Sequence, residues 1–204
     1  MLNSKNLLEN LQNQTERHLQ KAIADWQNLP PALLAAAPAA GKWSAAQCLE
    51  HLNFYGKFYL PAIAAAIEQA RATGRQTAEN FQPGWLGGRF TKMMLPQHDG
   101  GGGLKNKMSA PKNARPAAAP DPVATLAEFI EQREKMLGLL AAAAAVDLNS
   151  VRVPISIARW LRLKLGDVLM FMTAHDFRHL LQAERAVAQA AGRAPVFFEM
   201  IDFQ

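Results

Sequence analysis

The sequence predicts an all-α protein, a four-helix bundle with one long connection between its second and third helices. Apolar residues recur at three- and four-residue steps through four long segments, which is the spacing of amphipathic helices. Patterns typical of strands are almost absent, and no shift of composition divides the 204 residues. This length suits one domain, so we expect a single domain over residues 1–204.

The first helix is predicted over about residues 4–26. The side chains at helical spacing along its inward face are Leu7, Leu8, Leu11, Thr15, Leu19, Ala22, Ile23 and Trp26. Proline cannot continue a helix, because it lacks the backbone donor and its ring clashes with the preceding turn. Pro30 and Pro31 are therefore expected to end this helix.

The second helix is predicted from Ser44 to about Thr73. Ser44 and Gln47 have the spacing of a capping box, in which each side chain satisfies the free backbone donor of the other residue. Gly74 is a natural stop signal. Pro61 lies inside the segment, and we expect it to kink the helix.

The third and fourth helices are predicted over about residues 122–146 and 167–191. Asp121 is an expected N-cap, and Pro122 follows it at the first helical position, where proline is favoured. Asp167 is a cap candidate for the last helix.

The connections differ greatly in length. Residues 75–121 form a connection rich in glycine and proline, with a short helix expected near residues 86–94. So long a connection inside one domain is unusual and often functional. Residues 151–157 alternate as a strand would, but Pro154 interrupts them, so we interpret them as an extended connection.

Composition favours a soluble protein of the cytoplasm. Cys48 is the single cysteine, which excludes an internal disulfide and suits a reducing compartment. The N-terminus lacks the continuous apolar region of a signal peptide. The longest apolar run, residues 136–146, is far shorter than the ~20 residues that span a bilayer, so no membrane partner is expected.

Positive charge is concentrated in two connections. Residues 82–115 contain six basic side chains against one acid, and residues 150–165 contain four against none. The net charge of +5 is low for a dedicated nucleic-acid binder. The aromatic residues there are too sparse for a base-stacking platform, so nucleic acid is not an expected partner: Phe81, Trp85, Phe90 and Trp160.

Three histidines are predicted to face the core. His51 falls inside the apolar arc of the second helix, and His175 and His179 share one face of the fourth helix, one turn apart. Two ligands from one helix and a third from a facing helix would make a metal site with an open fourth position, as in catalytic zinc sites. The residue pattern also allows these to be hydrogen-bonded core histidines without a metal.

Other histidine interpretations are weaker. His175 and His179 have the spacing of the zinc-protease motif, but Asp176 stands where that motif has a catalytic glutamate. His18 is expected at the boundary of an apolar face, and His98 at a solvated surface.

The segments that contain these histidines resemble a known family. Residues 42–52 (Lys-Trp-Ser-Ala-Ala-Gln-Cys-Leu-Glu-His-Leu) are similar to the helix-two signature of the DinB/YfiT-like metalloenzyme superfamily. Residues 175–182 are similar to its last-helix signature, in which two histidines are followed by a glutamine. Residues 107–116 also resemble the connection before the third helix in one subgroup.

The resemblance implies a four-helix bundle with a divalent metal held by His51, His175 and His179. Imidazole ligands suit zinc, nickel, copper and iron alike, and we expect zinc or nickel. The family includes thiol transferases that use low-molecular-weight thiols, and its members often form dimers. The resemblance is to metalloenzymes and not to the DNA polymerase that shares the label.

These observations lead to one main function hypothesis and one alternative. The first is a metal-dependent enzyme for a small-molecule substrate, a thiol-dependent group transferase or a metal-assisted hydrolase. Tyr55, Gln182 and Cys48 are candidates to line its substrate site, and no acidic residue is expected beside the histidines on the inward faces. The alternative is a non-catalytic helical module that binds a metal or an anion.

Overall fold

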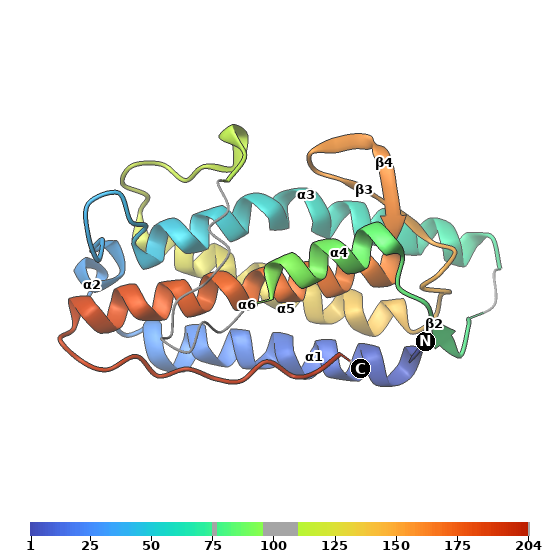
Figure 1. Cartoon of the computed structure of the whole chain (residues 1–204), viewed down its shortest axis with the longest axis horizontal. Coiled ribbons are helices and arrows are strands. Elements are labelled where there is room, and N and C mark those ends of the chain that lie inside the picture. The colour runs from blue at the N-terminus through green and yellow to red at the C-terminus, as the bar shows by residue number, and fades with distance from the viewer. Residues whose placement is uncertain (75–76, 96–109, 204) are drawn as a thin grey trace.

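The computed structural model describes residues 1–74, 77–95 and 110–203. The described chain is mostly helical, as predicted. Its four long helices lie side by side (Figure 1). They are α1 (Ser4–Gln20), α3 (Ala45–Ala72), α5 (Pro122–Ala143) and α6 (Leu165–Ala190). Both α1 and α3 pack against α5 and α6, so α6 contacts the two helices that come before the long connection.

The remaining elements are short. The helical ones are the π-helical turn η1 (Lys21–Trp26), α2 (Pro31–Ala35), α4 (Trp85–Met94) and the 3₁₀ turn η2 (Lys112–Ala114). The strands are β1 (Leu2–Asn3), β2 (Asn80–Phe81), β3 (Arg152–Ile155) and β4 (Ala158–Lys164). Helix α4 confirms the short helix expected near residues 86–94. No helix in the described ranges is long and apolar enough to cross a bilayer.

Large apolar side chains from all four long helices form the core. One cluster includes Leu11 of α1, Ile63 of α3, Leu140 of α5 and Leu169 of α6, each with no exposed surface. A second cluster contains Trp26, Leu49, Leu52, Phe129, Leu180 and Val187. Burying side chains of this size contributes about 1.5–3 kcal/mol each, which makes helix packing the main source of stability.

Two of the predicted helix caps are confirmed. Ser44 and Gln47 form the capping box of α3. The backbone N–H of Gln47 donates to Ser44 Oγ over 3.2 Å, and the backbone N–H of Ser44 donates to Gln47 Oε1 over 3.0 Å. Asp121 accepts hydrogen bonds from the backbone amides of Val123 and Ala124 at the start of α5.

Asp167 is not the cap of the last helix, so that prediction was wrong. Helix α6 begins at Leu165, directly after β4, with Lys164 at the N-cap. The Asp167 carboxylate instead accepts the Gly84 backbone amide, at 3.0 and 3.1 Å. It thereby ties the segment before α4 to α6, a long-range contact with no local signature in the sequence.

The proline pair ends the first helix and also begins another. The predicted helix over residues 4–26 is α-helical to Gln20 and π-helical from Lys21 to Trp26. Pro31 then occupies the first position of α2, where its missing amide costs nothing. Helix α3 is continuous through Pro61.

The interpretation of residues 151–157 as an extended connection was wrong. They belong to an antiparallel hairpin in which Arg152 pairs with Lys164 and Val153 with Leu163. A two-stranded hairpin consists of edge strands only, so Pro154 is tolerated, and the register shifts between Pro154 and Ile155. A second short pair, β1 with β2, was also not predicted.

Candidate metal centre

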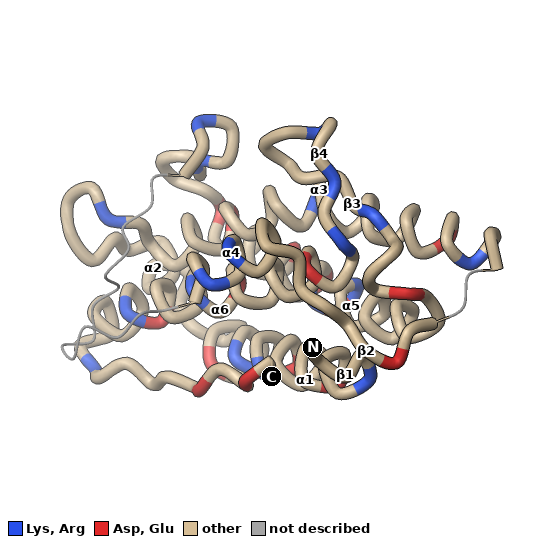
Figure 2. Tube along the Cα trace, turned by 45° about the vertical axis from the view of Figure 1, so that its right-hand side comes forward, with Lys and Arg blue, Asp and Glu red and all other residues tan. Residues whose placement is uncertain are grey.

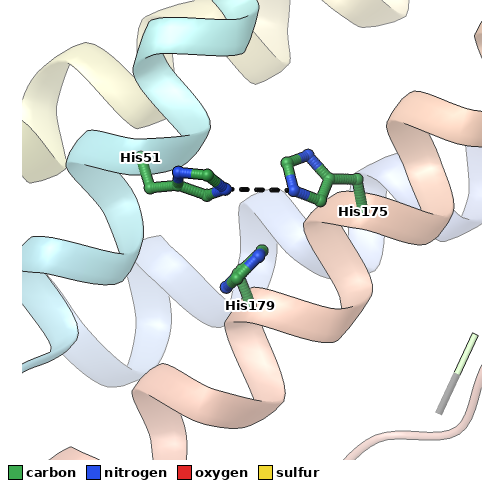
Figure 3. Close-up of side chains that lie close together, drawn as sticks. All are labelled: His51, His175 and His179. Atoms are coloured by element: carbon green, nitrogen blue, oxygen red, sulfur yellow. Dashed lines mark hydrogen bonds between the residues drawn. The ribbon is translucent and has the colours of Figure 1, made fainter. Parts of the chain in front are cut away.

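His51 of α3 and His175 and His179 of α6 lie together and point toward one another (Figure 3). Their ligand-capable nitrogen atoms all lie within 4.8 Å of one another, an arrangement that could hold a metal ion. The Nε2 atoms of His51 and His175 are 3.2 Å apart. The contact between α3 and α6 therefore brings together the three histidines that the sequence singled out.

Two of these rings are oriented by a hydrogen bond from Nδ1. His51 Nδ1 lies 2.7 Å from the Ala114 carbonyl oxygen, and His179 Nδ1 lies 3.1 Å from Gln182 Oε1. A carbonyl oxygen can only accept, so both Nδ1 atoms carry the proton. Each Nε2 then presents a lone pair, which is the tautomer that binds a metal through Nε2.

This donor set fits a divalent transition metal. Two imidazole nitrogens on a tetrahedral zinc ion, about 2.0–2.1 Å from the metal, lie roughly 3.3 Å from each other. The 3.2 Å between His51 and His175 Nε2 is close to this edge, while the three ligand atoms together lie within 4.8 Å of one another. His175 Nδ1 is buried and has no hydrogen-bond partner among the described residues, so the protein itself leaves this ring only partly satisfied.

Burial keeps the three imidazoles neutral. Burial, together with the His51 and Arg178 side chains, lowers the pKa of His179 to about 3 against the opposing effect of its bond to Gln182. Burial, the neighbouring histidine rings and two arginine side chains hold the pKa of His175 well below its ordinary value. Burial also lowers the pKa of His51. Neutral imidazole is the form that binds metals, so no proton has to leave first near pH 7.

Aromatic rings surround the histidines. Trp43 lies 5.1 Å from His51 and 5.9 Å from His179 between ring centroids. Tyr55 lies 5.1 Å from His51 and 4.6 Å from His175, on whose ring Phe171 also stacks at 5.5 Å. Sequence reasoning missed Trp43 and Phe171 as wall residues, although both lie close to the histidines in the sequence.

The three predicted lining residues have different positions. Gln182 contacts His179 directly, and Tyr55 packs against two of the histidine rings. Burial and Tyr59 raise the pKa of Tyr55 to about 12, so its hydroxyl keeps its proton near pH 7. Cys48 lies in the second apolar cluster with no exposed surface, outside the histidine group, and burial raises the pKa of its thiol.

The expectation concerned acidic residues beside the histidines on the inward faces, and α6 buries two carboxylates that pair with basic side chains instead. Asp176 and Glu184 are both 1% exposed. Arg133 of α5 donates to Asp176, and Lys21 approaches Glu184 to 3.0 Å. These carboxylates are buried as ion pairs, and the histidine group itself contains no carboxylate among the described residues.

His18 does not join the cluster. His18 is fully buried and not at a boundary, with its Nε2 atom 2.9 Å from Gln14 Nε2 and its ring 6.2 Å from that of Phe177. The prediction for His98 falls outside the described residues, as does most of the glycine-rich part of the connection.

The second basic segment forms the β3–β4 hairpin, where lysine and arginine mark both strands (Figure 2). Trp160 on β4 is 85% exposed, while the Arg159 guanidinium lies 5.4 Å from the Phe58 ring. This hairpin is a cationic surface apart from the histidine group.

Fold and site together define a helical protein with a candidate metal centre between two of its long helices. The sequence profile of the DinB superfamily matches residues 14–183. This span covers most of the chain and all three histidines, and the chain therefore belongs to the DinB superfamily. No curated protein and no solved structure matches the chain.

Proposed function

We propose that this protein is a divalent-metal-dependent enzyme that acts on a small-molecule substrate, a thiol-dependent group transferase or a metal-assisted hydrolase. The supporting observation is the convergence of three neutral imidazoles, two of which are oriented by a hydrogen bond from Nδ1. Membership of a superfamily does not assign a substrate. The histidine group supports the metal in this proposal, and the thiol-dependent reaction class is what the resemblance to the superfamily implies.

In this proposal His51, His175 and His179 hold the metal, and the expected metal is zinc or nickel, which imidazole ligands suit. Such a metal supplies a thiolate or a hydroxide as nucleophile at neutral pH. That chemistry suits a histidine group without a carboxylate base. We further propose the four-helix bundle arrangement of the DinB/YfiT type, a cytoplasmic location and a homodimer.

The surrounding side chains have positioning tasks. Gln182 accepts from His179 Nδ1 and so fixes the orientation of that ring. The Tyr55 hydroxyl, which stays protonated, can donate to negative charge that develops on a substrate. The Trp43 and Phe171 rings exclude water, and exclusion of water strengthens each polar interaction in the site.

One observation favours the alternative, a non-catalytic module that binds a metal or an anion. The three histidines are only 3%, 4% and 9% exposed. A closed site of this kind can hold an ion without admitting a substrate.

The proposal is tested by the metal content of protein purified without an affinity tag or added metal. The expected result is about one divalent metal per chain, lost in a His175→Ala/His179→Ala variant that keeps its helical circular dichroism. His18→Gln, which changes a histidine outside the cluster, is the matched control and should keep the metal. A wild-type protein that takes up none of zinc, nickel, manganese or iron would contradict the metal site.

Titration of the metal-loaded protein with small thiols then separates the two functions. A thiol-dependent transferase should bind a thiol and transfer it to an electrophile, and a metal-assisted hydrolase should show turnover without a thiol. A metal site that binds no thiol and supports no turnover would favour the non-catalytic module.

A further inference from the structure

Residues 114–118, called the strap below, are fastened to the first turns of α3 beside His51. Gln47, Glu50 and His51 lie at three- and four-residue spacing, so they share one face of α3. All three side chains form hydrogen bonds with the backbone of the strap. This segment belongs to the long connection, so the connection reaches the candidate metal centre.

The Glu50 contact is the shortest of these bonds. The Ala117 amide donates to Glu50 Oε2 over 2.6 Å. Hydrogen bonds to an ionised carboxylate are roughly twice as strong as neutral ones. Gln47 Nε2 adds bonds of 3.0 and 3.2 Å to the Ala117 and Ala118 carbonyls, while the other end of its amide closes the capping box.

The strap supplies the atom that sets the tautomer of His51. The Ala114 carbonyl accepts from His51 Nδ1, and Ala114 is 2% exposed, so water has little access to replace this bond. The opposite ring nitrogen, Nε2, faces His175 at 3.2 Å. The direction of that lone pair therefore depends on where the strap holds its carbonyl.

We propose that Glu50 is a positioning residue of the metal centre, holding the strap so that the Ala114 carbonyl directs His51 Nε2 into the site. Glu50 acts through the backbone and not by touching the metal or substrate. The inference rests on the proposed function for its effect on metal affinity, but its effect on the His51 ring is independent of that function.

The first test measures zinc affinity of the full chain by competition with a chelator. Loss of a direct outer partner of a metal ligand weakens metal binding by about 10–100-fold. Glu50→Ala removes only one tie of the strap that carries this partner, so its loss of zinc affinity should lie near the lower end of this range. Glu50→Gln should lose less, because its amide oxygen still accepts from Ala117. Glu68→Ala, which removes an exposed carboxylate from the same helix, should leave the affinity unchanged.

The second test reads the His51 ring by nitrogen-15 NMR in metal-free protein. Wild type should show one tautomer with the proton on Nδ1, and Glu50→Ala should show a mixture, with partial recovery in Glu50→Gln. If Glu50→Ala does not fold, Glu50→Gln replaces it in both tests. It should show a smaller loss of zinc affinity and a smaller fraction of the second His51 tautomer.

Unchanged zinc affinity together with an unchanged His51 spectrum in Glu50→Ala would overturn the inference, as would an equal loss of affinity in Glu68→Ala. A wild-type protein without zinc affinity would overturn the proposed function instead. In that case the His51 spectra alone would test whether Glu50 orients the His51 ring.

Discussion

His175 and Asp176 are consecutive residues of α6, and the chain buries them in opposite ways. Asp176 meets the Arg133 guanidinium of α5, and both side chains are almost completely buried as an ion pair. His175 meets His51 and His179, and burial keeps all three rings neutral. Helix α6 therefore contributes to a buried ion pair and, one residue away, to a group of neutral imidazole rings.

The difference separates a structural cluster from a candidate binding site. In the ion pair the two charges offset each other within the protein, although Arg133 Nε and Nη2 and Asp176 Oδ1 have no further hydrogen-bond partner among the described residues. Removing one partner leaves an uncompensated charge. Three neutral imidazoles facing one another have lone pairs that the protein does not fully use. Variants that remove one side chain from either group test this distinction.

Arg133→Ala should have the largest effect on folding. It leaves Asp176 as a buried carboxylate without its partner, which typically costs about 3–5 kcal/mol of unfolding free energy. Urea denaturation measures this loss. Lys135→Ala, which breaks an exposed pair with Glu131 on the same helix, should cost less than about 1 kcal/mol. Equal losses of unfolding free energy in the two variants would contradict a structural role for the buried Arg133–Asp176 pair.

Metal should stabilise the folded protein through the histidine group. Free zinc at 100 times its dissociation constant should raise the unfolding free energy by about 2.7 kcal/mol. The His175→Ala/His179→Ala variant should lose this increment, while Lys135→Ala should keep it. Urea denaturation with and without zinc provides the measurement, and an equal zinc effect in the histidine variant would argue against the site.

Acid should lower the unfolding free energy of the metal-free protein through its buried histidines. Their pKa is lowered in the folded state, so the unfolded chain binds protons that the folded chain does not. Stability should therefore fall as the pH drops below about 6.5, by about 1.4 kcal/mol per pH unit for each such histidine. For His179 this loss continues to about pH 3.

Urea denaturation in EDTA between pH 7 and pH 5 checks this prediction. His18→Gln removes one buried histidine outside the cluster and should make the pH dependence shallower. Stability that does not change over this range would contradict neutral burial of the histidines.

Cys48→Ala should have the smallest effect on the site. Cys48 packs in the apolar cluster outside the histidine group, so metal content should match that of wild type. The buried thiol should react with a disulfide reagent only after unfolding, since burial raises its pKa and blocks access. Loss of metal in this variant would show instead that Cys48 contributes to the metal site.

Much of the helical fold was predictable because its signals are local. The α3 capping box is set by Ser44 and Gln47, three residues apart, and the Asp121 cap lies directly before α5. The hairpin escaped prediction because Pro154 disfavours a strand in general, yet a two-stranded hairpin accepts it. Asp167 has the type and place of a cap, but a long-range bond to Gly84 uses its carboxylate.

The long helices and the inward direction of His51, His175 and His179 follow from the sequence, because helical periodicity assigns a face to each residue. What those faces meet depends on how the helices pack. Packing of α3 on α6 brings the three rings together, Arg133 pairs with Asp176, and the Ala114 carbonyl orients His51. A backbone carbonyl is the same in every residue, so no sequence pattern could reveal that contact before the chain had folded.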